Sequence, residues 1–173
     1  MPTFLRQTKF KKGFTLTELL VVLLIVGLIS SIAFANYRQG EKQFALQRSA
    51  VALSQNIRTA QNMSMGASSY QSFKGYGIYF NLSSPNSYIL FADEGDGLYG
   101  TGDEEIETFW LEAGISLYSL SPGNPLSVAF FPPDPFTLIN SDLNEDYASI
   151  VLTHDEGETE TVSLNKVGLI EVE

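Results

Sequence analysis

The sequence predicts an α+β protein in which a long N-terminal helix packs on an antiparallel β-sheet or β-sandwich domain. The first observation is an apolar run over residues 14–35, followed by a helical pattern that continues to residue 66. The second is a change to period-two alternation from residue 74 to the end, which is typical of strands. The expected division is therefore a helix over 14–66 and a β-rich domain over 74–173.

The apolar run carries one charge, Glu18, in 22 residues. A helix of that length spans about 33 Å, which matches a bilayer core of roughly 30 Å. We therefore expect residues 14–35 to be transmembrane. The segment before them holds four bases and no acid (Arg6, Lys9, Lys11 and Lys12). This basic flank predicts a single-pass protein of the inner, cytoplasmic membrane, with residues 1–13 inside and everything after residue 35 translocated.

Two simpler interpretations of the same run remain open. A secretory signal peptide would be cut after Ala33-Phe34-Ala35, although its apolar region is usually only about 7–15 residues long. A plain single-span anchor explains the length of the run. It does not explain why Gly13 and Glu18 flank its start.

These flanking residues carry a family resemblance. The stretch Lys11-Lys12-Gly13-Phe14-Thr15-Leu16-Thr17-Glu18-Leu19-Leu20 resembles the processing site of type IV prepilins and type II secretion pseudopilins. The resemblance implies that residues 1–13 are a cytoplasmic leader, removed by a prepilin peptidase between Gly13 and Phe14. It also implies N-methylation of Phe14 and makes Glu18 the fifth residue of the mature chain.

The chemistry of Glu18 fits an assembly role. A carboxylate in an apolar helix costs about 2.5–3.5 kcal/mol at mid-bilayer, and less near an end. Cleavage would give Phe14 an α-ammonium group, spaced i, i+4 from Glu18 if both are helical. Pairing Glu18 with its own amine or with that of a neighbouring subunit would remove an unpaired charge, and pairing with a neighbour would set filament register.

The rest of the helical region has a narrow apolar stripe. Positions 46, 50, 53, 57, 60 and 64 share one helix face, which we expect to dock on the protein's own core. Eight strand-like runs follow, over residues 75–81, 87–92, 106–111, 115–120, 126–131, 148–154, 160–165 and 167–172. We expect the Pro-rich segment 130–136 to be a rigid crossing between strands, and the alternative is an exposed binding loop.

The region after the span has its own, looser resemblance. Residues 49–64 and the closing 162–170, with Asn165 and Gly168, are similar to H-type minor pseudopilins. Type IV pilins usually carry a C-terminal disulfide, and this chain has no cysteine. That departure favours a pseudopilin or another minor subunit over a major pilin.

The net charge of the chain limits the classes of molecule that it can bind. The formal net charge is −10, and removal of the leader's four bases would take it to −14. Such a surface repels nucleic acid phosphates, so we expect no nucleic acid partner. The lack of cysteine also excludes thiolate metal sites and cysteine nucleophiles.

An acidic, glycine-rich loop follows the second strand-like run. Seven acids lie between Asp93 and Glu107 with no base among them. Calcium prefers six to eight oxygen ligands, so Asp93, Asp96, Asp103 and Glu104 are candidate ligands of a calcium loop. The alternative is a solvated acidic loop that binds nothing. No cofactor is otherwise required.

Catalysis has little support. A hydrolase needs a positioned nucleophile and an oxyanion site. The only histidine, His154, is followed by a turn-like Asp-Glu-Gly sequence. The sequence contains no nucleophile motif with which this histidine could act. We predict no enzymatic activity and no catalytic residue.

The resemblance therefore implies a structural subunit, a minor pilin or pseudopilin, of a type IV pilus-like or type II secretion filament. Its implied partners are other pilin or pseudopilin subunits, the prepilin peptidase and methylase, and inner membrane platform proteins, with the lipid bilayer before assembly. Its implied destination is a periplasmic or cell-surface filament. The alternative is an uncleaved, membrane-anchored β-domain that acts as a binding module.

Overall fold

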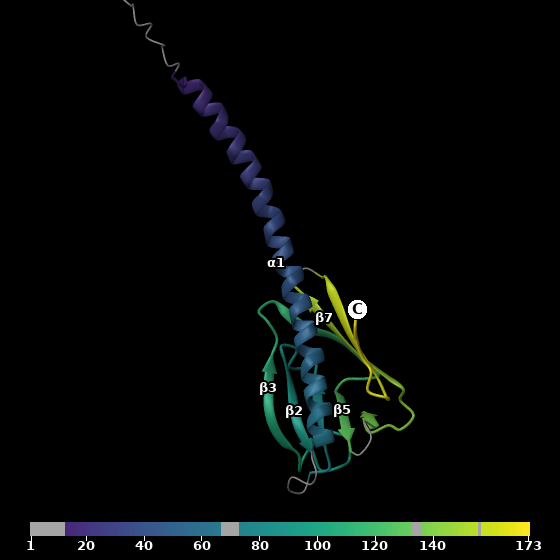
Figure 1. Ribbon diagram of the computed structural model, residues 1–173. Helices are drawn as coiled ribbons and strands as arrows, with labels where there is room; N and C mark the ends of the chain where they lie inside the picture. The colour runs from purple at the N-terminus through teal and green to yellow at the C-terminus, as the bar shows by residue number, and fades with distance from the viewer. Residues whose placement is uncertain (1–12, 67–72, 133–135, 156) are drawn as a thin grey trace, which may run out of the picture. The chain divides into compact units, whose positions relative to one another are not determined.

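The computed structural model describes residues 13–66, 73–132, 136–155 and 157–173, without the side chains of 35–39. It confirms the α+β class, with one helix followed by antiparallel strands (Figure 1). The chain divides into two compact units, Met1–Gly40 and Glu41–Glu173, which are described separately below. Helix α1 covers Leu16–Gly66 and contributes to both units.

Nine strands follow α1 and form two antiparallel sheets. One sheet has five strands in the order β3-β2-β1-β5-β6, and the other has four in the order β4-β7-β8-β9. The strands are β1 (Gly75–Phe80), β2 (Ser87–Asp93), β3 (Glu104–Trp110), β4 (Ile115–Ser121), β5 (Leu126–Phe131), β6 (Phe136–Ile139), β7 (Tyr147–His154), β8 (Thr159–Asn165) and β9 (Ile170–Val172).

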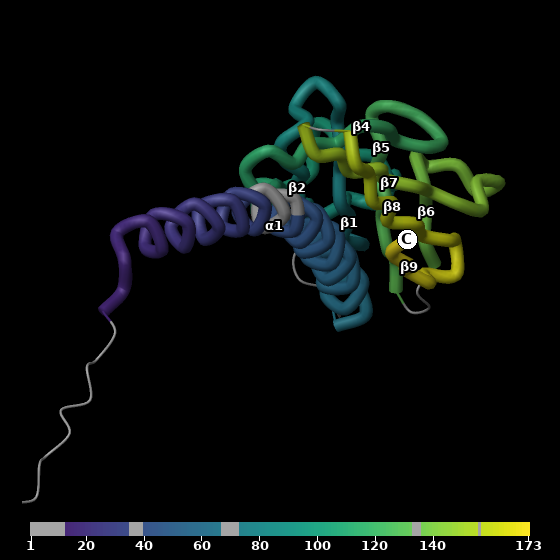
Figure 2. Tube along the Cα trace, turned by 90° about the horizontal axis from the view of Figure 1, so that it is seen from above, coloured from purple at the N-terminus to yellow at the C-terminus, as the bar shows by residue number. Residues whose placement is uncertain are grey.

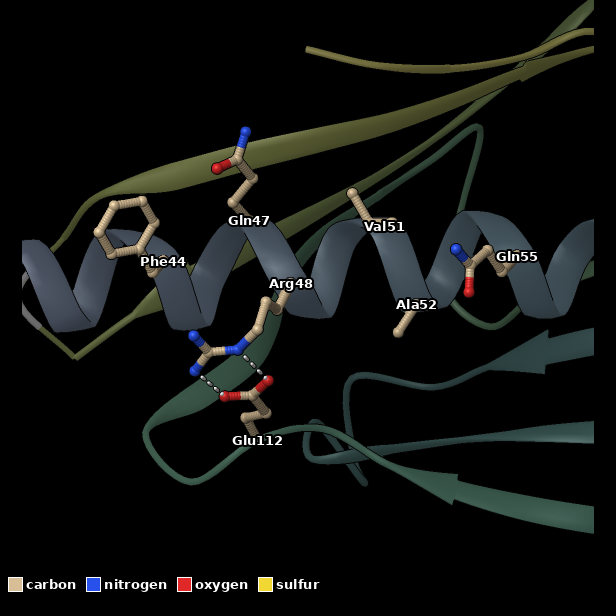
Figure 3. A pocket seen from close by; sticks show the side chains of 7 residues that line it. All are labelled: Phe44, Gln47, Arg48, Val51, Ala52, Gln55 and Glu112. Atoms are coloured by element: carbon tan, nitrogen blue, oxygen red, sulfur yellow. Dashed lines mark hydrogen bonds and ion pairs between the residues drawn. The ribbon is translucent and has the colours of Figure 1, made fainter.

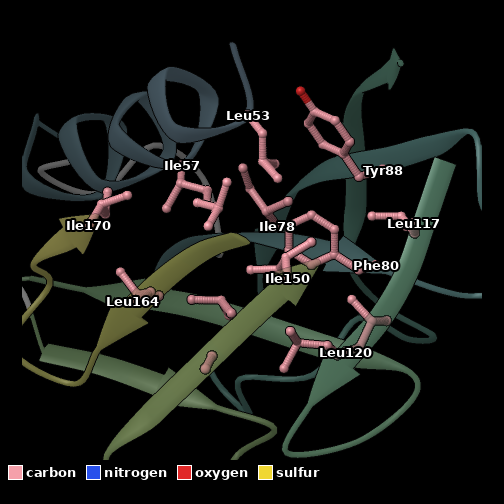
Figure 4. Packing of buried hydrophobic residues seen from close by; sticks show 14 of the residues in the cluster. Leu53, Ile57, Ile78, Phe80, Tyr88, Leu117, Leu120, Ile150, Leu164 and Ile170 are labelled. Atoms are coloured by element: carbon pink, nitrogen blue, oxygen red, sulfur yellow. The ribbon is translucent and has the colours of Figure 1, made fainter. Parts of the chain in front are cut away.

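A single core joins both sheets to the 41–66 part of α1. The predicted apolar stripe is confirmed, since all six of its positions are buried, from Leu46 to Ser64. Leu53 and Ile57 point from the helix toward Ile78 of the first sheet and Ile150 of the second (Figure 4). Because these apolar side chains leave water together, burial of this face is what holds the helix on the domain.

The helix segment has one covered side only. In Figure 2 the strands gather on one side of residues 41–66, and the opposite side faces outward. Phe44 and Val51 lie on that outward side, where 62% and 40% of their surfaces are exposed. Neither residue belongs to the stripe that anchors the segment. The second unit therefore keeps apolar surface beyond what its own fold uses.

Two expectations for the β-domain were wrong. The Pro-rich segment is not a crossing, because Phe131 pairs with Phe136 and β5 and β6 are neighbours in one sheet; residues 133–135 of this segment lie outside the described residues. The last strand starts at Ile170 instead of 167, because Asn165 and Gly168 form a turn. Gly168 has a φ of +82° and its N–H donates to the Asn165 carbonyl at 2.9 Å.

Candidate processing and assembly site

The start of α1 is defined by a side-chain cap. The first helical residue is Leu16, so Gly13, Phe14 and Thr15 precede the helix. Thr15 Oγ1 accepts the Glu18 N–H at 3.2 Å, and the Thr15 carbonyl accepts the Leu19 N–H at 3.1 Å. This is the geometry of an N-cap, in which a hydroxyl satisfies one of the otherwise unpaired amides of the first turn.

The cap changes the expected relation between Phe14 and Glu18. The i, i+4 pairing on one helix face requires Phe14 to be helical, and the structure places Phe14 before the helix. Glu18 lies in the first turn, three residues after the cap. A carboxylate at this position is favoured by the positive end of the helix dipole. The pattern Thr-x-x-Glu at 15–18 is the sequence signal that predicts this cap.

Gly13 has no structural reason to be glycine within this chain. A Cβ added there would meet nothing within 4 Å, and its φ is not in the left-handed region. The fold therefore accepts any L-residue at this position. A requirement for glycine at 13 would have to come from another molecule that approaches the backbone closely.

The first turn leads directly into an apolar segment. In the part of the chain that the structure describes, one helical stretch, Leu16–Phe34, is long and apolar enough to cross a membrane by length and composition. Its mean hydropathy is 2.5 and none of it is buried in the chain. Glu18 lies at the end of this span, where a carboxylate costs less than at its centre.

A groove lies on the outward side of α1 in the second unit. Its volume is about 550 Å³, and it is lined by Phe44, Gln47, Arg48, Val51, Ala52, Gln55 and Glu112 (Figure 3). Arg48 spans it with two parallel bonds to Glu112, from Nε at 3.0 Å and from a terminal nitrogen at 2.9 Å. The bonds from Arg48 lower the pKa of the Glu112 carboxyl.

Sequence reasoning missed this groove. Arg48 and Glu112 are 64 residues apart, and no local pattern links them. The signal available in the sequence was the position of Phe44, a large aromatic residue that lies off the predicted apolar stripe. Such a residue is not needed to dock the helix on its own domain.

The acidic loop uses its carboxylates to hold its own backbone. Asp93 is fully buried and accepts hydrogen bonds from the N–H groups of Gly95 and Gly97. Asp103 accepts the Glu94 and Gly100 N–H groups at 3.1 and 2.8 Å. These bonds explain why aspartates follow the strand: each closes a turn of the glycine-containing chain.

The described residues contain no preformed cluster of ligands for the predicted calcium site. Among the described residues, no group of three acidic or histidine side chains is arranged to hold a metal ion. Asp96 Oδ1 accepts the Leu98 N–H at 2.9 Å, and Glu104 lies on β3. Calcium binding by Asp93, Asp96, Asp103 and Glu104 thus stays a prediction that solution experiments must decide.

The pKa of the Asp93 carboxyl provides a test of whether the loop binds calcium. Burial raises the pKa of the Asp93 carboxyl, against the hydrogen bond from Gly95, and the nearby Asp103 and Asp96 raise it further. The folded state therefore binds a proton more readily than the unfolded state. The contribution of Asp93 to the free energy of unfolding is therefore most favourable below the pKa of Asp93 in the unfolded chain, and it is lost as pH rises through the pKa in the folded chain.

We expect Asp93 to titrate above the ordinary aspartate value of about 3.9 in a carboxyl NMR titration of residues 41–173. A bound calcium ion would favour the ionised form and lower this pKa. Magnesium, and sodium at matched ionic strength, serve as controls for screening. A fall with calcium alone supports the metal loop. Equal responses to all three salts leave a loop that binds no specific cation.

The only histidine lies at the end of a strand, next to the predicted turn, as the sequence indicated. His154 is the last residue of β7, and its N–H donates to the Glu158 carbonyl at 3.0 Å. This bond ties the end of β7 to the residue before β8, which gives His154 a structural position.

Comparison with known proteins bears on the N-terminal segment. Residues 8–34 match the family model described as the prokaryotic N-terminal methylation motif. No curated protein and no solved structure gave a significant match to the chain. The motif supports a pilin-like protein that a prepilin peptidase processes, anchored by one membrane span. The match ends before the β-domain, so the resemblance to H-type minor pseudopilins is not confirmed.

Proposed function

We propose that this chain is a structural subunit, a minor pilin or pseudopilin, of a type IV pilus-like or type II secretion filament. The observation that carries the proposal is the match of residues 8–34 to the methylation motif, a range that contains Gly13, Phe14 and Glu18. In this proposal the peptidase cuts between Gly13 and Phe14, and Phe14 is then methylated. The β-domain lies outside the cytoplasm and joins a periplasmic or cell-surface filament.

The exposed apolar span supports assembly. Every described side chain of Leu16–Phe34 is exposed in the chain itself. Outside a bilayer that surface requires apolar neighbours, because roughly 0.8 kcal/mol is lost for each CH₂ returned to water. Packing against the same span of other subunits satisfies this requirement. Glu18 then pairs with the Phe14 amine of a neighbour and sets the register.

The groove on α1 in the second unit is a further candidate contact between subunits. Phe44 and Val51 are seven residues apart, which is about two helical turns, so they lie on the same side of the helix. Ala52, which also lines the groove, has a small side chain and allows another helix to approach closely. A second copy, or a related subunit, packed along α1 would cover these residues. At the groove, the carboxylate of Glu112 balances the positive charge of Arg48, so a packed subunit would not face an unpaired arginine.

Substitution of Phe44 by glutamate is therefore expected to lower filament incorporation by at least about tenfold, since it replaces apolar contact surface by a carboxylate that must lose its water at a packed helix contact. Processing and the fold should stay unchanged, because Phe44 lies outside the core. The measurement is the amount of protein in a sheared filament fraction from the native host, with the mature mass recorded.

The matched control is Tyr118→Glu on β4, where the side chain is 66% exposed and lies outside the groove. It should incorporate as the wild type does. If Phe44→Glu also incorporates normally, the groove is not a subunit contact.

The uncleaved, membrane-anchored binding module remains the second candidate, favoured by the single span and the self-contained core of residues 41–173. Mass analysis of the mature protein separates the two. A methylated chain that starts at Phe14 supports the filament subunit, and a chain that starts at Met1 supports the anchor.

A further inference from the structure

We propose that Thr15 is a positioning residue for processing: its hydroxyl fixes where α1 begins and so holds the Gly13–Phe14 bond outside the helix. The inference rests on the proposed cleavage between Gly13 and Phe14. It adds a residue that neither touches the scissile bond nor carries charge.

The contacts of Thr15 single it out from its neighbours. Its Oγ1 accepts the Glu18 N–H at 3.2 Å and lies 3.1 Å from Thr17 Oγ1. Phe14 has no side-chain hydrogen-bond acceptor, and Gly13 has no side chain. Of the three described residues before the helix, Thr15 alone can cap the first turn.

An uncapped start would not stay at Leu16. The amides of the first turn lie at the end of an apolar span, where unpaired backbone groups are costly. Extending the helix backward over Thr15 and Phe14 is one way to satisfy them, and nothing at Gly13 prevents it, since a side chain added there would meet no other atom. The Thr15 hydroxyl satisfies the Glu18 amide in place and removes the need for that extension.

The position of the helix start matters for a peptidase. Two residues that change from extended to helical shorten the chain by about 4 Å, from the rise per residue of each conformation. The cut site would move by that distance toward the span, and the Phe14 carbonyl would accept the Glu18 N–H in a helical hydrogen bond. Misplacement of a reacting bond by as little as about 1 Å can cost on the order of a hundredfold in rate.

The test compares four full-length chains in native membranes: wild type, Thr15→Val, Thr15→Ser and Thr17→Val. Valine keeps the shape of threonine and removes the hydroxyl, whereas serine keeps the hydroxyl. Thr17 is the matched control, because it is the same residue type within α1 and, among the described residues, its hydroxyl contacts Thr15 Oγ1 but accepts from no backbone amide. The rate of leader removal is followed by pulse-chase, and the products by mass.

We expect Thr15→Val to slow cleavage by about tenfold, which is within the effect of losing an N-cap, and Thr15→Ser and Thr17→Val to stay within about twofold of wild type. A second readout does not involve the peptidase. In the full-length chain in detergent micelles, the Cα chemical shift of labelled Phe14 should move toward the helical value in Thr15→Val only.

Each outcome decides a different statement. Wild-type cleavage of Thr15→Val, or an unchanged Phe14 shift, overturns the positioning role and leaves the proposed function intact. Equal slowing by Thr15→Ser and Thr15→Val also overturns it, because the peptidase would then be reading the threonine side chain directly. A wild-type chain that does not start at Phe14 overturns the proposed function, and this inference with it.

Discussion

Replacement of Gly13 by valine is expected to leave a full-length, membrane-bound precursor in place of the mature protein. The chain itself tolerates the change, because a Cβ at this position meets nothing within 4 Å and the backbone is not left-handed. The whole effect should therefore arise where the peptidase approaches the backbone. We expect cleavage to slow by on the order of a hundredfold, as for other misplaced reacting bonds.

Gly27→Val is the matched control for this experiment. Gly27 also has nothing within 4 Å of an added Cβ, and it lies inside the apolar span, far from the cut site. Both variants add the same side chain to the N-terminal unit. Mass spectrometry should show a mature N-terminus at Phe14 in Gly27→Val and an intact leader in Gly13→Val. Normal processing of both would show that the site assigned to Gly13 and Phe14 is wrong.

The sequence anticipated the features that depend on local pattern. The stripe from Leu46 to Ser64 predicted the buried helix face, because helical spacing alone decides which side chains share a side. The strands β1, β2, β4 and β5 lie close to their expected bounds, since each is an apolar or β-branched run between turn residues.

Features that depend on tertiary contacts or on short segments were missed. Strand β6 has only four residues and follows a run of prolines in the sequence, so its pattern was too short to predict a strand. The Arg48–Glu112 pair joins a helix to a loop 64 residues later, and only the folded core brings them together. The burial of Asp93 was equally invisible, because an acid-rich loop predicts solvent exposure unless the backbone amides it accepts are known.

The N-terminal site lies between these cases. The methylation motif could be predicted, because a basic flank, a glycine and a lone acid at the start of an apolar run together form its pattern, whereas cleavage between Gly13 and Phe14 stays a prediction. Its geometry could not, since the helix was expected to start at Phe14 and starts at Leu16. A cap of one hydroxyl decides that difference, and it places Glu18 in the first turn, near the end of the span.

Substitution of Glu18 by valine should accordingly separate processing from assembly. Valine suits the apolar span, so membrane insertion and cleavage after Gly13 are expected to proceed. The Phe14 amine would then have no carboxylate partner inside the filament. Loss of one member of a buried ion pair costs about 3–5 kcal/mol, which corresponds to a loss of incorporation of more than about a hundredfold.

The control is Glu41→Val, which removes an exposed acid from the same helix beyond the span. Each variant loses one negative charge, so a general charge effect would appear in both. The measurement is the ratio of protein in sheared filaments to mature protein in membranes, with the N-terminus confirmed by mass. Glu18→Asp, which keeps the charge on a shorter side chain, should retain part of the incorporation that Glu18→Val loses. If Glu18→Val enters filaments as well as Glu41→Val does, the amine finds its partner elsewhere and register is not set by Glu18.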